Sequence, residues 1–238
     1  MAQVESANIV GYENLAAPRN SFIALGVQFV DPLTDEVRTV AISNLVETTN
    51  PRTGNAIGNN VDQIHVWTGS AWKKYYHRTG VGYVADGAED LTVPTSDTVS
   101  VGDGVFFRKG NFNKDGVATI CGAVFMGDSV TYALTRNAFT FVSYPWPIEF
   151  SISDFAELIT NPRTGNAIGN NVDQIHVWTG SAWKKYYNRT GVGYVEDGAA
   201  DLTVPTSDKI NPGVCVFVRK GNFNKDGALT FVKPASLQ

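Results

Sequence analysis

Apolar and polar residues group along this chain in short segments, and the pattern predicts β-strands joined by tight turns. Residues 21–30 are mostly apolar, β-branched or aromatic, as expected of a buried strand, and residues 138–146 have the same character. The segments 63–67 and 72–78 flank the turn-forming residues 68–71, which predicts a β-hairpin. Aromatic residues lie on both of its strands, where they can make cross-strand contacts.

Two further elements complete the predicted pattern. The segments 105–108 and 117–120 flank a polar loop and predict a second hairpin. Ser153 precedes an apolar stripe with helical spacing that ends before Pro162, which predicts a helix of about two turns. Ser43 opens a weaker version of the same segment. The predicted fold class is therefore all-β with one short helix per repeat.

An internal repeat dominates the sequence. Residues 50–97 recur at 161–208, and a looser match continues downstream of both segments. The two segments differ at only three positions, which are His77/Asn188, Ala85/Glu196 and Glu89/Ala200. Paired globular modules suit this pattern better than a solenoid, because two copies are too few and each is too long for short stacked repeats.

The predicted organisation is accordingly a tandem pair of duplicated β-rich modules. They span residues 1–126 and 127–238, each sandwich-like or barrel-like, and are related by a pseudo-two-fold axis. The near-identity of the copies does not mark functional residues, since a recent duplication preserves idle and working residues alike.

Composition supports a β fold and narrows the choice of partners. The chain has 28 Val and 21 Thr against 10 Leu, a bias that favours strands. Its formal net charge is −4, so it lacks the positive field that a nucleic-acid or anionic-membrane binder needs. No apolar run approaches the roughly 18 residues of a membrane-spanning helix. Neither nucleic-acid binding nor membrane insertion is predicted.

Localisation outside the cell is predicted, either secreted or at the cell surface. Chains of low charge that are rich in Thr, Gly and Asn are common there. The first residues, Met1-Ala2-Gln3, do not form a signal peptide, so one is expected to have been removed. A cytosolic protein without a targeting signal is the alternative.

Catalytic chemistry finds little support in the sequence. The histidines are His65, His77 and His176, and none has the spacing of a zinc site. The common nucleophile motifs are missing as well. Asp86, Glu89 and Asp90 cluster on a predicted turn, where they could supply the carboxylate pair of a glycosidase, but the second copy has Ala200 in place of Glu89. We therefore expect neither enzymatic activity nor a required cofactor.

The richest cluster of aromatic residues lies on the predicted hairpin and its copy. Strand alternation must turn some of these rings outward, where they would form a platform for stacking on a sugar or contacting another protein. The alternative is that most of the rings are core between packed sheets. The candidate ligand-binding residues are Trp67, Trp72, Tyr75, Tyr76, Trp178, Trp183, Tyr186 and Tyr187.

One loop has the spacing of a weak calcium site. Oxygen-bearing side chains alternate before a glycine, as in the first half of a calcium-binding loop, but the bidentate glutamate of such loops is missing. The alternative is a turn that uses Asn and Asp-Gly for their backbone conformations. The candidate ligands are Asn111, Asn113 and Asp115, with Asn222, Asn224 and Asp226 in the second copy.

The two cysteines, Cys121 and Cys215, occupy non-equivalent positions in the copies. A disulfide within the chain, a link between chains and two free thiols all remain open.

These patterns together predict a non-catalytic structural or interaction protein. Its expected partners are another copy of itself or another protein, bound through terminal or edge strands. A carbohydrate-binding, lectin-like module that uses the aromatic hairpins is the alternative function, with glycans as partners.

Overall fold

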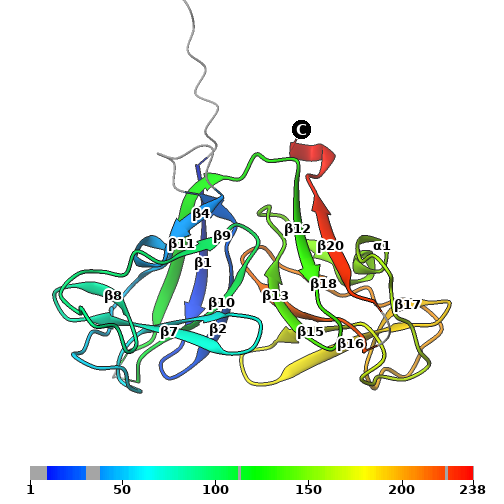
Figure 1. The fold of residues 1–238 in the computed structure, drawn as a ribbon, viewed down its shortest axis with the longest axis horizontal. Coiled ribbons are helices and arrows are strands. Elements are labelled where there is room, and N and C mark those ends of the chain that lie inside the picture. Colours follow the sequence, from blue (N-terminus) through cyan, green and yellow to red (C-terminus); the bar gives the residue numbers. More distant parts are fainter. Residues whose placement is uncertain (1–9, 31–37, 112–113, 223–224, 238) are drawn as a thin grey trace, which may run out of the picture.

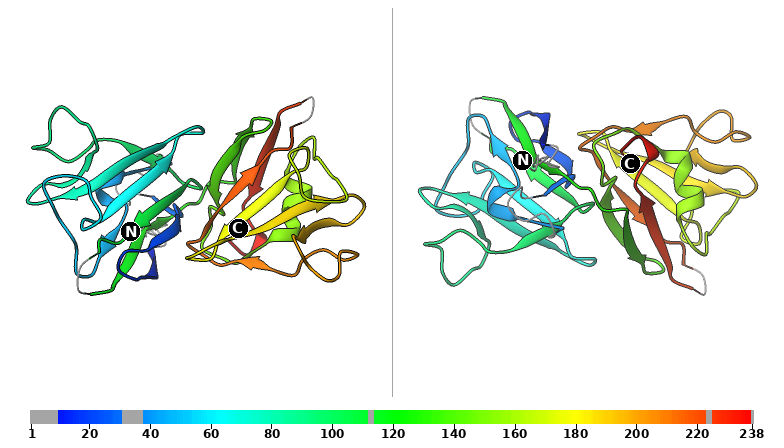
Figure 2. Two further views of the ribbon diagram at one scale, coloured as in Figure 1. Left: turned by 90° about the horizontal axis from the view of Figure 1, so that it is seen from below. Right: turned by 90° about the horizontal axis from the view of Figure 1, so that it is seen from above.

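The computed structural model describes residues 10–30, 38–111, 114–222 and 225–237, and this part of the chain is mostly β (Figure 1). Two groups of strands lie side by side in Figures 1 and 2. We call residues 10–124 the N-terminal lobe and residues 129–237 the C-terminal lobe.

The elements of the two lobes follow one another in a similar order. The N-terminal lobe contains β1 (Val10–Ala17), β2 (Phe22–Gly26), β3 (Phe29–Val30), β4 (Thr39–Ala41), the 3₁₀ turn η1 (Ile42–Asn44), β5 (Glu47–Thr48), β6 (Gln63–Trp67), β7 (Trp72–Arg78), β8 (Gly82–Ala85), β9 (Thr98–Ser100), β10 (Gly104–Arg108) and β11 (Gly116–Val124). The C-terminal lobe contains β12 (Ser129–Leu134), β13 (Phe139–Ser143), β14 (Phe150–Ser151), η2 (Ile152–Asp154), α1 (Phe155–Leu158), β15 (Gln174–Trp178), β16 (Trp183–Arg189), β17 (Gly193–Glu196), β18 (Lys209–Ile210), β19 (Cys215–Arg219), β20 (Gly227–Val232) and η3 (Ala235–Leu237).

A five-stranded antiparallel sheet is the largest in each lobe. Its order is β2-β10-β6-β7-β8 in the N-terminal lobe and β13-β19-β15-β16-β17 in the C-terminal lobe. The predicted hairpin is confirmed as β6–β7, with Trp67 opposite Trp72, and its copy is β15–β16. Smaller sheets complete each lobe, and none of the sheets in the described residues closes on itself.

The first and last strands of each lobe pair with one another. β1 pairs with β11 and β12 pairs with β20, so the first and last described strands, β1 and β20, are both paired within the chain. In the described residues, β1 and β12 each pair along one side only and are therefore edge strands.

The predicted second hairpin is wrong. β10 lies between β2 and β6, whereas β11 pairs with β1, β3 and β5 in another sheet. The chain passes from one sheet to the other at Lys109 and Gly110, both of which are buried. The Lys109 ammonium is held there by the Asn50 carbonyl at 2.7 Å. Such a buried polar anchor leaves no trace in the hydrophobic pattern from which hairpins are predicted.

The predicted helix exists in a shorter form and, among the described residues, is found in the C-terminal lobe alone. A 3₁₀ turn at Ile152–Asp154 leads into the four residues of α1, and no side chain caps either segment. The N-terminal lobe has the 3₁₀ turn η1 at the corresponding place. The predicted strand at 21–30 is also interrupted, into β2 and β3.

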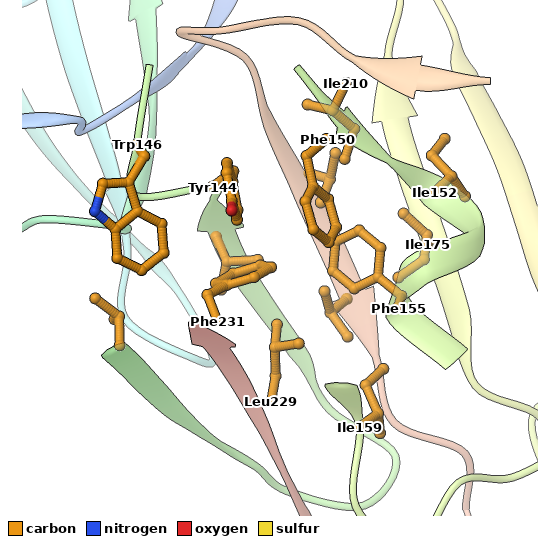
Figure 3. Close-up of a cluster of buried hydrophobic side chains, with 14 of the residues drawn as sticks. Tyr144, Trp146, Phe150, Ile152, Phe155, Ile159, Ile175, Ile210, Leu229 and Phe231 are labelled. Atoms are coloured by element: carbon orange, nitrogen blue, oxygen red, sulfur yellow. The ribbon is translucent and has the colours of Figure 1, made fainter. Parts of the chain in front are cut away.

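Both lobes bury aromatic and branched side chains. The N-terminal core gathers Leu25, Ile64 and Phe107 with their neighbours. Figure 3 shows the C-terminal core, in which rings succeed one another from Trp146 to Phe155. Complete burial of side chains of this size contributes roughly 1.5–3 kcal/mol each. The same core includes Val30, Val101 and Ala123 of the N-terminal lobe, so the apolar interior continues from one lobe into the other.

Candidate functional site

Strand alternation sends one face of each five-stranded sheet to its own lobe's core and the other face outward. The outward faces meet in an aromatic cluster that we call the seam. Its buried members are Ala24, Phe106, Phe141, Cys215 and Phe217, and the half-buried rings around them are Phe22, Trp67, Trp72, Phe139, Trp178 and Trp183. The central rings, Phe141 and Phe217, stack with centroids 4.3 Å apart.

Hydrogen bonds cross the seam in both directions. Trp67 Nε1 donates to the Phe139 carbonyl at 2.9 Å, and Trp178 Nε1 donates to the Phe22 carbonyl at 3.0 Å. Buried Gln28 adds a further link, since its amide donates to the Tyr144 carbonyl at 3.0 Å. Half-buried indoles thus satisfy their polar groups against the opposite lobe, and each bond contributes about 1 kcal/mol.

The eight predicted platform residues therefore fall into two sets. The four tryptophans lie in the seam. The four tyrosines, Tyr75, Tyr76, Tyr186 and Tyr187, are buried at 2–3% exposure in cores and smaller clusters within the lobes. The structure brings the tryptophans of both hairpins together and does not place the tyrosines beside them.

Two of the buried tyrosines donate a hydrogen bond from the phenol hydroxyl to an aspartate. Tyr75 donates to Asp97 at 2.9 Å and Tyr186 donates to Asp208 at 2.7 Å. Burial, followed by the bond to the aspartate, raises the pKa of both phenols above the ordinary value. They are neutral hydrogen-bond donors at physiological pH.

Hollows open at two places along the seam. Trp67 lines one of about 390 Å³ together with Asp103, Thr135 and Thr140. Trp178 lines the other, of about 280 Å³, in which Val214, Pro18 and Ile23 take the corresponding places. Burial raises the pKa of the Asp103 carboxyl. Because an aspartate and two threonines line the first hollow where apolar residues line the second, the first hollow is the more polar of the two.

The aspartates of the predicted calcium loops have structural partners. Asp115 accepts the backbone N–H of Arg19 at 2.9 Å, and Asp226 accepts that of Arg136 at 2.8 Å. Asn113 and Asn224 lie outside the described residues, while Asn111 and Asn222 are exposed. Among the residues described, no cluster of three His, Cys, Asp or Glu side chains could hold a metal ion. The calcium site stays a prediction.

Two of the histidines are fixed and neutral. His65 and His176 each contact a neighbouring glutamine through Nε2 at 2.8 Å. Burial is the main cause that lowers the pKa of both rings to about 4, and the positive charges of a nearby lysine and arginine contribute less. His77, which is Asn188 in the second copy, stacks on Tyr83 with ring centroids 4.9 Å apart.

A buried ion pair in each lobe was missed by the sequence reasoning. Lys109 Nζ lies 2.9 Å from Asp62 and Lys220 Nζ lies 2.8 Å from Asp173, with all four side chains at 0% exposure. Asp62 also accepts the backbone N–H groups of Arg52 at 2.9 Å and Gly110 at 2.8 Å. The available signal was an aspartate at the start of an apolar strand segment, which requires a partner if it is buried.

Both cysteines are free thiols. Cys121 is exposed on β11 opposite Tyr12, whereas Cys215 is buried in the seam. Burial raises the pKa of the Cys215 thiol well above its ordinary value. The exposed thiol is therefore the more reactive one.

No family model matches the chain, and neither the curated proteins nor the solved structures include one that matches it. Within the described residues, no helix has the length and apolar character needed to cross a membrane.

Proposed function

We propose that this chain is a non-catalytic structural or interaction protein, built from two duplicated β modules with the boundaries 1–126 and 127–238 and a pseudo-two-fold relation between them. Support for the modules comes from the sequence repeat together with the equal strand order of the two large sheets. The reciprocal tryptophan bonds support the pseudo-two-fold relation.

The use of its ionisable groups supports a role without catalysis. The buried lysine–aspartate pairs have no exposure through which a substrate could reach them. The rings of His65 and His176 are neutral and held by glutamines. These groups stabilise loops and strands, which leaves the exterior of the molecule to carry the function.

The observation that carries the proposal is the pair of edge strands. β12 contains neither a charged residue nor a proline, the usual means of protecting an edge from pairing with another chain. On β1, Tyr12 is 71% exposed and lies opposite exposed Cys121. We propose that a second copy of this chain pairs with these edges.

Light scattering over a range of protein concentrations tests this assembly. We expect a mass above that of the monomer, which rises with concentration. Thr131→Lys on β12 and Tyr12→Lys on β1 add a charge to each edge and should return the protein to the monomer. The matched control is Val204→Lys, because Val204 is 57% exposed but lies outside the strands. A monomeric wild-type protein at every concentration would refute assembly.

We also propose that the protein acts outside the cell, as its low charge suggests. Immunoblotting of the medium, the cell surface and the lysate of the source cells tests this. Confinement to the cytosol would contradict it. The lectin-like alternative has weaker support, because the tyrosines of its platform lie inside the lobes and the tryptophans lie in the seam.

A further inference from the structure

The outward face of the N-terminal sheet continues beyond the seam into a polar end. Four neighbouring strands contribute Phe22 from β2, Arg108 from β10, Gln63 and His65 from β6, and Lys74 from β7. Arg108 pairs in register with Phe22 and Gln63, while His65 pairs with Lys74. These side chains line a hollow of about 380 Å³ with Gly58, Asn59 and Asp86 at its border.

Hydrogen bonding fixes the histidine of this hollow in one tautomer. The Gln63 amide nitrogen donates to the Gly58 carbonyl at 2.6 Å, so the oxygen of that amide faces His65. Because this oxygen can only accept, His65 Nε2 donates to it at 2.8 Å. The ring is neutral at physiological pH. His65 Nδ1 is therefore an acceptor, and no hydrogen bond among the described residues occupies it.

The cations of the hollow are held by different means. Arg108 is 7% exposed, its guanidinium lies over Phe22 at 5.6 Å from the ring centre, and it donates to Asn20 at 2.8 Å. Lys74 is exposed at the border, as is Asp86. With His65 neutral, the lining carries one more positive than negative charge.

The charges and hydrogen-bonding groups of this hollow indicate the chemical class of its ligand. One net positive charge suits a single carboxylate, and Lys74 and Arg108 are the donors for it. The acceptors His65 Nδ1 and Asp86 require hydroxyl donors from the ligand, which a sugar supplies and which sulfate lacks. We propose that the hollow binds an acidic sugar of the uronate class. This inference does not depend on the proposed assembly and uses a different surface.

The C-terminal lobe repeats the hydrogen-bonded framework of the site. Gln174 donates to the Gly169 carbonyl at 2.7 Å and contacts His176 at 2.8 Å. Arg219 donates to Asn137 at 2.8 Å, as Arg108 does to Asn20. A chain with two such sites would bind repeating acidic polysaccharides with increased avidity.

Titration by NMR with galacturonate at constant ionic strength tests the proposal. We expect chemical-shift changes at His65, at His176 and at their strand neighbours, with neutral galactose and inorganic sulfate producing much smaller ones. Lys74→Gln together with Lys185→Gln should weaken uronate binding by up to about fivefold, the upper end of the range for an exposed charge contact. Both lysines are exposed, so the fold is not at risk.

The matched control is Lys114→Gln with Lys225→Gln, which removes the same charge from exposed positions elsewhere. It should leave uronate binding unchanged. Equal binding of galactose and galacturonate would overturn the recognition of the carboxylate. Failure of galacturonate to shift either histidine would overturn the site itself. An equal loss of binding in the control and in the Lys74/Lys185 variant would show that uronate binds through non-specific electrostatic attraction and not at this site.

Discussion

Removal of the buried ammonium of Lys109 should strongly destabilise the protein. In Lys109→Met the Asp62 carboxylate, at 0% exposure, would lose its partner at 2.9 Å, and the Asn50 carbonyl would lose a donor at 2.7 Å. Met fills most of the volume of the lysine stem, so the cost is chiefly electrostatic. Leaving one member of a buried pair without its partner costs about 3–5 kcal/mol. We expect the free energy of unfolding to fall by that amount.

Urea denaturation followed by tryptophan fluorescence measures this change. The matched control is Lys209→Gln, because Lys209 pairs with Glu149 at 2.9 Å with the side chains 57% and 53% exposed. An exposed pair of this kind contributes little to stability, so this control should leave the urea midpoint nearly unchanged. Lys220→Met should behave like Lys109→Met. A loss below about 1 kcal/mol in both buried-lysine variants would refute the reasoning, since it would mean that the remaining donors stabilise the carboxylate sufficiently.

Three further outcomes are expected. The pKa values of His65 and His176 lie near 4, below the ordinary 6.5, so the unfolded chain binds more protons between these values. Stability should be complete above pH 6.5 and decline toward pH 4, and replacing both histidines by Gln should flatten a plot of urea midpoint against pH. In the native protein, a thiol reagent should modify Cys121 at once and Cys215 only after denaturation; native modification of neither would contradict the free thiols. Trp178→Phe should cost about 1 kcal/mol through loss of a single hydrogen bond across the seam, and an unchanged urea midpoint would count against that bond.

Local sequence patterns predicted many of the strands but missed others, such as β8 and β12. The hairpin of β6 and β7 was predictable because a short polar turn separates two segments rich in aromatic residues, and both the turn and the pairing are local. The β10–β11 pairing failed because the connection crosses between sheets. That crossing depends on Lys109 and Asp62, which are far apart in the sequence. Contacts of this kind cannot be derived from the periodicity of either segment.

The sites were predicted less well than the strands. Alternation along β7 places Trp72 and Tyr75 on opposite sides of the strand, and they belong to different clusters in the structure. It could not indicate that the outward side of Trp72 would be covered by the second lobe. The polar hollow escaped prediction for a similar reason, since His65 and Arg108 become neighbours only through the register of β6 and β10.

The two sides of the seam differ in residues that lie outside the near-identical segments 50–97 and 161–208. The tryptophans on its two sides are the same, but Gly104 on the N-terminal side faces Cys215 and Phe141 on the C-terminal side. A Cβ at Gly104 would lie 2.9 Å from Cys215 Cβ and equally close to the Phe141 ring. Two C-terminal faces would therefore collide, and two N-terminal faces would leave a cavity, either of which is destabilising. Because small residues on one side of the seam meet large residues on the other, the seam fits one N-terminal lobe against one C-terminal lobe. A single chain already supplies one lobe of each kind. The association between chains proposed above would then use another surface. Tyr12 on β1 and Thr131 on β12 are exposed and are not members of the seam.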